Sequence, residues 1–236
     1  MDVIARVPGR VLDLAFPAVC PGCRREGPPI CDRCLPALDA RLEQPAGVPI
    51  GLPSEVPPPL LQLEWCAPFG GVVRRALHQL KYGGETRLAR PLGEAVARRW
   101  RRVGAGGNLL VPVPVHAERR RRRGYDQAEL IAAVAAEALG LPMAPLLRRE
   151  RSTIAQFDLD RRRRATNVAG AFELAPGAAG VARRAAAHGG TGPLAGWWVI
   201  LVDDVVTTGA TLAACAEPLL AAGAIGVSAV TVARER

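Results

Sequence analysis

The sequence is poor in several kinds of residue, and each shortage narrows the classes of protein open to it. Aromatic residues make up only 4% of the 236 residues, so few rings are available to stack on the bases of a single-stranded nucleic acid. The chain has no run of about 18 apolar residues, and its first ten residues lack the apolar core of a signal peptide. We therefore expect a cytoplasmic protein that does not insert into membranes.

Acidic residues are also outnumbered by basic ones. The chain has 31 Lys and Arg against 22 Asp and Glu, a formal net charge of +9, and Lys81 is its only lysine. An excess of positive charge attracts phosphate groups, whether they belong to a small substrate or to a nucleic acid. The 49% hydrophobic content and the length are sufficient for one ordinary folded domain with a small appendage.

The most informative stretch is WVILVDDVVTTGAT, residues 198–211. Five apolar residues with β-branched members run into Asp203 and Asp204, which favours a buried parallel strand over residues 198–202 that ends at a loop. The alanine-rich residues 210–222 then predict a helix. A strand-to-helix turn points N–H groups and the helix dipole at one place, which favours a phosphate. Carboxylates beside it would face sugar hydroxyls or magnesium, so the stretch predicts a site for a ribose 5-phosphate.

Four of the six cysteines form two C-x-x-C pairs close to the N-terminus: Cys20, Cys23, Cys31 and Cys34. In a chain without an export signal, such pairs favour a structural zinc ion with four cysteine ligands. A redox pair and unligated thiols are the alternatives. Cys66 and Cys215 are isolated, and we expect them to be small buried apolar residues.

Segments with the periodicity of strands alternate with segments that have the periodicity of helices. Short apolar runs predict strands at residues 61–67, 109–115, 143–147, 168–174 and 226–233. Amphipathic or alanine-rich segments predict helices at residues 35–42, 71–82, 86–101 and 128–139, and a short interrupted helix within 1–15. This alternation predicts an α/β fold, with a parallel sheet covered by helices on both faces.

Proline- and glycine-rich segments divide the chain. Residues 45–60 contain too much proline and glycine for a helix or strand and predict a linker. The linker would separate a zinc-binding module, residues 1–44, from an α/β domain, residues 61–236. The low-complexity residues 176–196 predict a mobile surface loop.

Two loops are predicted to bind ligand, because the carboxyl ends of parallel strands form the usual binding edge of such a sheet. One is the acidic turn at 203–211. The other, residues 116–127, contains five consecutive arginines, 119–123, whose guanidinium groups suit a diphosphate. A solvated charged surface or a nucleic-acid patch is the alternative for these arginines.

Residues 199–211, VILVDDVVTTGAT, resemble the phosphoribosyl pyrophosphate (PRPP) signature of type I phosphoribosyltransferases. The wider set of motifs consists of the two C-x-x-C pairs, GGVVRRALHQLKYGG, VPVPVH with RRRRRGYDQAEL, and STIAQFDLDRRRRATNVAGAF. Together they resemble the ComF family, competence-associated proteins with a type I phosphoribosyltransferase fold and an N-terminal zinc module. Two departures from the family's pattern are Ala117, where Pro is frequent, and Asp126, where Asn is frequent.

The resemblance also implies roles for particular residues. Asp203 and Asp204 would contact the ribose hydroxyls and act in catalysis. The 5-phosphate would lie against Thr207, Thr208, Gly209, Ala210 and Thr211. A flexible hood, about residues 149–167, would close over the substrate. Candidates for contacts with the pyrophosphate or in the hood are Val115, His116, Arg119, Arg123, Gln156, Arg164, Asn167 and Lys81.

Three functions follow as hypotheses. The first is Mg²⁺-dependent transfer of ribose 5-phosphate from PRPP with release of pyrophosphate, in a protein associated with DNA uptake. Thr207 stands where purine-type transferases carry an acid, which disfavours a 6-oxopurine acceptor. The second is a non-catalytic competence factor that binds single-stranded DNA and has a regulatory or vestigial PRPP site. In the third, the zinc module docks a helicase-like competence protein.

Overall fold

The computed structural model describes residues 17–47, 56–149, 170–178, 180 and 192–235. Its centre is a four-stranded sheet in the order β3-β8-β7-β4, formed by Leu63–Pro68, Gly226–Arg234, Trp198–Val206 and Leu109–Pro112. All three neighbouring pairs are parallel. The middle strands are almost wholly apolar and buried, as expected of a parallel sheet covered on both faces.

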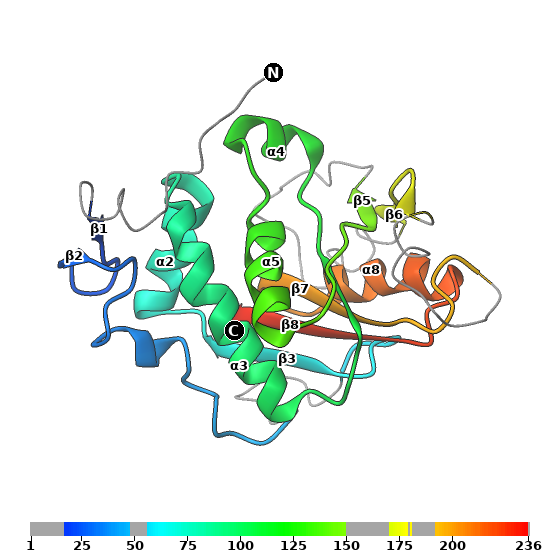
Figure 1. The fold of residues 1–236 in the computed structure, drawn as a ribbon, viewed down its shortest axis with the longest axis horizontal. Coiled ribbons are helices and arrows are strands. Elements are labelled where there is room, and N and C mark those ends of the chain that lie inside the picture. The colour runs from blue at the N-terminus through cyan, green and yellow to red at the C-terminus, as the bar shows by residue number, and fades with distance from the viewer. Residues whose placement is uncertain (1–16, 48–55, 150–169, 179, 181–191, 236) are drawn as a thin grey trace.

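Helices pack on both faces of the sheet (Figure 1). One face, with Ile200 and Val202, shares an apolar core with three helices, α2 (Gly71–Tyr82), α3 (Ala89–Val103) and α5 (Gln127–Leu139). The other face, with Val199 and Leu201, packs against α8 (Ala210–Ala221) and the antiparallel pair β5 (Leu147–Arg149) and β6 (Phe172–Leu174). The predicted α/β class, a parallel sheet flanked by helices, is confirmed.

Several predicted elements are found with small changes at their ends. The helix predicted at 86–101 begins with a 3-10 turn, η2 (Thr86–Leu88), and continues as α3. Only one 3-10 turn, η1 (Leu35–Ala37), lies within the helix predicted at 35–42. The strand predicted at 109–115 ends at Pro112. The helix predicted within 1–15 lies outside the described residues.

Three predictions were wrong in a way that matters for the site. Residues 116–127 contain a helix, α4 (Ala117–Arg123), because arginines have good helix propensity and Gly124, at φ +80°, supplies the left-handed C-cap. β7 continues to Val206, because β8 pairs with it as far as Arg234. In place of a strand over 143–147, Met143 forms a single bridge with Leu110 and β5 begins at Leu147.

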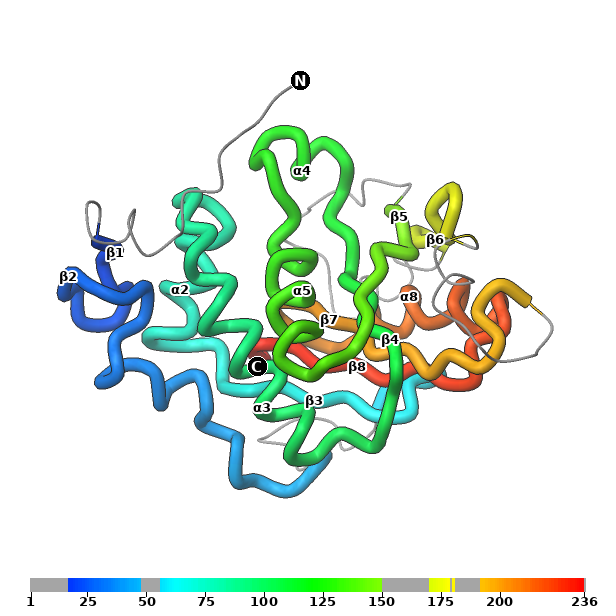
Figure 2. Tube along the Cα trace, viewed as in Figure 1, coloured from blue at the N-terminus to red at the C-terminus, as the bar shows by residue number. Residues whose placement is uncertain are grey.

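The N-terminal residues 17–47 pack directly on α2, α3 and β3 (Figure 2). They contain one small antiparallel pair, β1 (Ala18–Val19) and β2 (Glu26–Gly27). Cys20, Ile30 and Leu38 are buried in the same apolar core as α2 and α3. The cysteine-containing segment therefore shares its core with the α/β fold.

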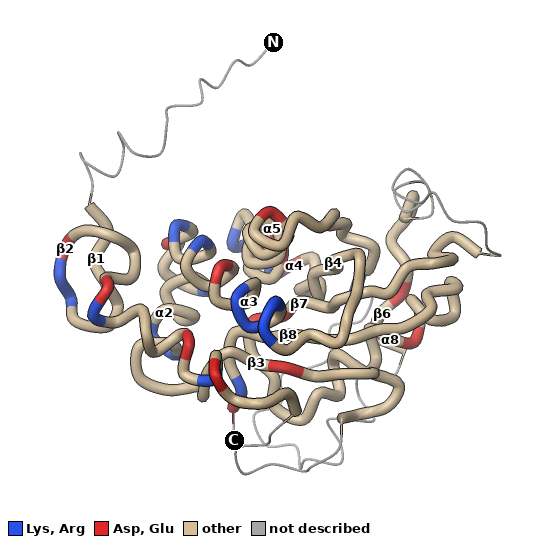
Figure 3. The backbone as a smooth tube through the Cα atoms, turned by 60° about the horizontal axis from the view of Figure 1, so that its bottom comes forward, with Lys and Arg blue, Asp and Glu red and all other residues tan. Residues whose placement is uncertain are grey.

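A buried ionic network fixes this contact. Arg99 of α3 lies 2.6 Å from the carboxylate of Glu64 on β3, and Arg41 of the N-terminal segment lies 3.5 Å from it. The Arg41 guanidinium also lies 3.7 Å from the ring centroid of Trp65, and Arg99 donates to the Gln44 carbonyl oxygen at 2.6 Å. Figure 3 shows basic positions of α3 close to the acidic position on β3. One carboxylate thus serves two arginines that are fully buried.

Glu64→Gln is expected to lower the free energy of unfolding by about 3 kcal/mol, because it removes the carboxylate that two buried guanidinium groups share. Chemical denaturation monitored by circular dichroism measures the change. The control is Glu43→Gln, since Glu43 pairs with Arg102 at 3.2 Å on the surface and such pairs contribute less than about 1 kcal/mol. Equal stability of the two variants would contradict the role given to Glu64.

Candidate functional site

The candidate site lies where β7 and β4 end and the loops after them diverge. Because alternate residues of a strand point to opposite faces, Asp203 follows Val199 and Leu201 toward α8, and Asp204 follows Ile200 and Val202 toward α2. Both acids lie within β7. The two adjacent carboxylates therefore lie on opposite faces of the sheet.

Asp204 is paired with the only lysine of the chain. The Lys81 ammonium, in the last turn of α2, lies 2.7 Å from Oδ2 of Asp204, and the two side chains are 22% and 7% exposed. The sequence suggested Lys81 as a contact for phosphate. In the free protein the ammonium instead neutralises one acid of the motif.

Asp203 has a different environment. Its Oδ1 accepts a hydrogen bond from the Asp204 N–H at 2.8 Å. Burial, and next the charge of Asp204, raise the pKa of the Asp203 carboxyl well above its usual range, although that N–H and Lys81 oppose the shift. Arg149 of β5 and Cys215 of α8 lie near enough to Asp203 to interact with it electrostatically.

The turn after β7 has the form expected of a phosphate cradle. Thr207 and Thr208 are exposed, and the Ala210 N–H donates to Thr208 Oγ1 at 3.3 Å. Gly209 caps α8 at φ +83° and has no side chain to satisfy the helix N–H groups. A Cβ at Gly209 would lie 2.6 Å from Cγ of Pro57. Glycine is thus required here, and the first turn of α8 keeps unused donors.

The two ends of the basic loop, residues 116–127, are joined by hydrogen bonds to one buried acid, Asp126. Asp126 accepts the Val115 N–H at 2.9 Å through Oδ2 and caps α5 by accepting the Ala128 N–H at 2.9 Å through Oδ1. Burial raises the pKa of this carboxyl, and these N–H groups oppose the shift. The N–H of Val115, a pyrophosphate candidate, is therefore already used within the protein.

The helix α4 projects away from the sheet, beyond the start of α5 (Figure 2). His116 caps α4, accepting the Glu118 N–H at 3.4 Å. Arg123 donates to Gln127 Oε1 at 2.9 Å and lies 5.0 Å from the ring centroid of Tyr82. The Tyr125 hydroxyl donates to the Leu80 carbonyl oxygen. The last turn of α2 thus contacts both the basic loop and, through Lys81, the acidic strand.

The structure brings Lys81, Asp203 and Asp204 together, and it places the candidates of the basic loop around α4. Arg119 lies close enough to Arg149 for the two charges to interact. Gln156, Arg164 and Asn167 lie outside the described residues. Sequence reasoning gave no individual role to Arg149, Tyr125 or Asp126. For Asp126, the signal was available, because an acid directly before a helix is a typical N-cap.

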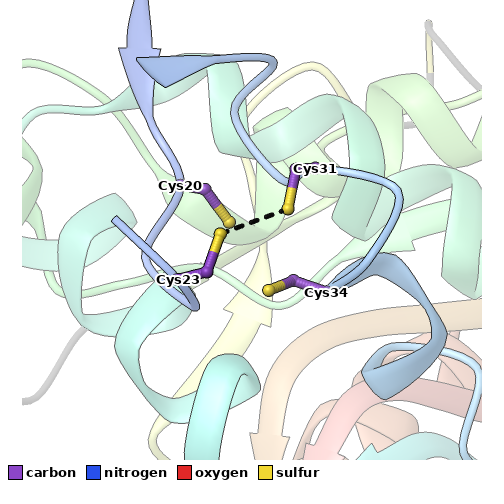
Figure 4. Close-up of side chains that lie close together, drawn as sticks. All are labelled: Cys20, Cys23, Cys31 and Cys34. Atoms are coloured by element: carbon purple, nitrogen blue, oxygen red, sulfur yellow. Dashed lines mark hydrogen bonds between the residues drawn. The ribbon is translucent and has the colours of Figure 1, made fainter. Parts of the chain in front are cut away.

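A second candidate site is the cysteine cluster (Figure 4). The sulfur atoms of Cys20, Cys23, Cys31 and Cys34 all lie within 4.8 Å of one another, and those of Cys23 and Cys31 are 3.4 Å apart. A Cβ on Gly22 would lie 2.4 Å from the Cys34 sulfur, so the glycine of C-P-G-C leaves room for this sulfur. All six cysteines are free thiols.

The cluster fits a tetrahedral zinc ion. Zn–S bonds of about 2.3 Å place the sulfurs about 3.8 Å apart. Burial raises the pKa of the Cys34 thiol to about 12, with contributions from the three other cysteines. For Cys20, burial acts in the same direction, but N–H groups of Cys31, Cys23 and Gly22 outweigh it and lower the pKa to about 6. Zinc binds cysteines as thiolates, so metal binding at this cluster would release the proton of Cys34.

Fold and site together define an α/β protein with a glycine-containing turn after an acidic parallel strand and an N-terminal cluster of four cysteines that could hold a metal ion. No family model matches the chain. DNA utilization protein YhgH of Salmonella typhi is 31% identical over 213 residues, 84% of this chain and 87% of that protein. Competence protein F of Haemophilus influenzae is 31% identical over 148 residues, 61% of this chain and 58% of that protein. The chain belongs to the ComF family.

Two solved structures with partial likeness are of enzymes named for phosphoribosyl chemistry. Glutamine PRPP amidotransferase of B. subtilis has 21% identity and a TM-score of 0.38, and the match covers 61% of this chain and 26% of that one. Purine phosphoribosyltransferase of Pyrococcus horikoshii has 15% identity and a TM-score of 0.35, over 62% of this chain and 82% of that one. TM-scores this low add nothing to the fold described above.

None of the helices in the described part of the chain combines the length and the apolar character that a membrane span requires.

Zinc analysis of protein purified without chelator is expected to give about one Zn²⁺ per chain. Cys23→Ser should reduce the content strongly, because a serine hydroxyl is a poor replacement for a thiolate ligand. The control is Cys66→Ala, since Cys66 is buried away from the cluster sulfurs and its loss should leave the zinc in place. A wild-type content well below one, or equal losses in both variants, would refute the assignment.

Proposed function

We propose that the protein binds PRPP and transfers its ribose 5-phosphate group in a Mg²⁺-dependent reaction, within the DNA-related role for which its relatives are named. The observation that carries the proposal is the direct succession, at one strand end, of a half-buried carboxylate, Asp203, and a glycine turn with free helix donors at 207–211. The 2- and 3-hydroxyls and the 5-phosphate of one ribose match these two features.

In this reaction the residues of the chain would position the bound PRPP and neutralise the charge of the departing pyrophosphate. The Thr207 and Thr208 hydroxyls and the first N–H groups of α8 hold the 5-phosphate, and the acidic end of β7 binds the ribose hydroxyls, with Asp203 as their acceptor. Arginines of α4, including Arg119 and Arg123, stabilise the charge of the departing pyrophosphate. Bound Mg²⁺ would neutralise the same leaving group. Positioning and electrostatics of this kind supply most of the rate of such a transfer.

The remaining assignments complete the proposal. Gln156, Arg164 and Asn167 would act in a hood over residues 149–167 that excludes water from the electrophilic sugar. Thr207 disfavours a 6-oxopurine as the acceptor. The four cysteines would bind zinc in a structural role within residues 1–44, on which a helicase-like competence protein would dock. A chain whose six cysteines form no disulfide, and that holds zinc through four of them, would suit a reducing cytoplasm.

Titration calorimetry with PRPP and Mg²⁺ tests the proposal. The wild-type protein is expected to bind, and Thr207→Ala with Thr208→Ala to bind at least about tenfold more weakly, because two hydroxyls that hold a charged phosphate are lost. Both threonines are exposed, so the substitutions should leave the fold intact.

The control for this titration is Arg90→Met, which removes an exposed side chain of α3 that pairs with Glu94. Its affinity for PRPP should equal that of the wild type. Absence of binding by the wild-type protein, or equal affinity of the double threonine variant, would show that the turn at 207–211 does not hold the ligand.

A second function, binding of single-stranded DNA, has its own supporting observation. Residues 120–122 of α4 expose their side chains, and Tyr82, 61% exposed, lies beside Arg123 at the base of the same loop. Basic side chains next to an exposed ring form the combination that binds a phosphate backbone and stacks on a base. This surface is continuous with the proposed pyrophosphate site, so the two functions would compete for it.

Replacement of Arg121 and Arg122 by Glu is expected to weaken binding of a short single-stranded oligonucleotide at least about tenfold in low salt and to reduce its salt dependence. Fluorescence anisotropy measures both. The control makes the same change at Arg101 and Arg102, at the end of α3. Equal weakening in the two variants would mean that DNA binding depends only on the net charge of the protein. Unchanged binding in the Arg121 and Arg122 variant would show that α4 is not part of the DNA-binding surface.

A further inference from the structure

Adjacent acids in a ribose-binding motif are usually treated as one unit, but here their surroundings differ. Asp204 points into the core that contains α2, and Asp203 points to the face covered by α8 and β5. Asp204 is nearly fully buried, whereas Asp203 is partly open to solvent. A ligand held at the turn 207–211 therefore meets the two carboxylates unequally.

Asp204 is buried and forms an ion pair within the protein. Its carboxylate receives the Lys81 ammonium at 2.7 Å, and Lys81 belongs to the turn whose Leu80 carbonyl oxygen accepts the Tyr125 hydroxyl. The next residue, Tyr82, lies under the Arg123 guanidinium. Lys81 thus connects the acidic strand to the turn on which the basic loop rests.

Asp203, by contrast, is only partly buried. Among the described residues, no ion pair reaches this carboxylate, and its hydrogen bond is to the N–H of the next residue. Two neighbouring carboxylates repel each other when both are ionised. Lys81 offsets part of the Asp204 charge and opposes the raised pKa of Asp203, so it favours the ionised form of Asp203, which can accept the hydroxyls of a ribose.

We propose that the two acids have separate roles: Lys81 is a positioning residue that holds Asp204 as a fixed internal anion, and Asp203 alone contacts the ribose. The inference rests on the proposed function for the role of Asp203. The pairing of Lys81 with Asp204 does not depend on the proposed function, because it is observed directly in the structure.

A double-mutant cycle tests the pair. Lys81→Met and Asp204→Asn should each lower the melting temperature by about 5 °C or more, because each leaves a partly or fully buried charge without its partner. The double variant should melt above both single variants, because it leaves neither charge. Arg90→Met with Glu94→Gln, at an exposed pair of α3, provides the matched control and should show no such coupling.

Calorimetry with PRPP and Mg²⁺ on the same variants separates the two acids. Asp203→Asn should bind at least about tenfold more weakly, and combining it with Lys81→Met should not restore binding. The Lys81→Met, Asp204→Asn double variant should bind within about threefold of wild type and more tightly than Asp204→Asn alone.

Three results would overturn the inference. Additive melting shifts would show that Lys81 and Asp204 do not act as a pair. A double variant that binds PRPP as weakly as Asp204→Asn would show that Asp204 itself contacts the ligand. A wild-type protein that melts normally but binds no PRPP would refute the proposed function and the ribose contact of Asp203, while the melting cycle would still decide the role of Lys81.

Discussion

The parallel pairing of β7 with β8 is the constraint on which the rest of the site depends. Both strands are buried on both faces, and their register runs from Trp198 opposite Gly226 to Val206 opposite Arg234. Because that pairing continues past the apolar run, Asp203 and Asp204 are held in extended backbone. Because alternate side chains of a strand point to opposite faces, one carboxylate lies on each face of the sheet. The turn at 207–211 follows β7 directly and therefore lies at the carboxyl end of the parallel strands.

The helix α2 connects the two candidate sites. Near its start, Arg75 donates to the carbonyl oxygen of Pro21, beside the cysteine cluster. Its last turn holds Asp204 through Lys81 and the basic loop through Leu80. A metal at the cysteines would therefore stabilise the packing of the helix that positions the ligand site, in agreement with the apolar core shared by the two regions.

Much of the fold followed from sequence, because its signals are local. The apolar run of β7, the alanine-rich sequence of α5 and the spacing of the cysteines are each contained within a short stretch. The ends of elements were harder, since β7 extends as far as its partner strand allows. The pairing of Lys81 with Asp204 joins residues more than a hundred positions apart, and no periodicity reports it. The buried pairing of Glu64 with Arg41 and Arg99 could not be predicted for the same reason, because it joins three separate segments of the chain.

A crystal structure of the protein with PRPP and Mg²⁺ tests the central claim most directly. The account predicts the 5-phosphate at residues 207–211, the ribose hydroxyls on Asp203, and Lys81 still paired with Asp204. A ligand bound elsewhere, or a ribose that displaces Lys81 to reach Asp204, would contradict it.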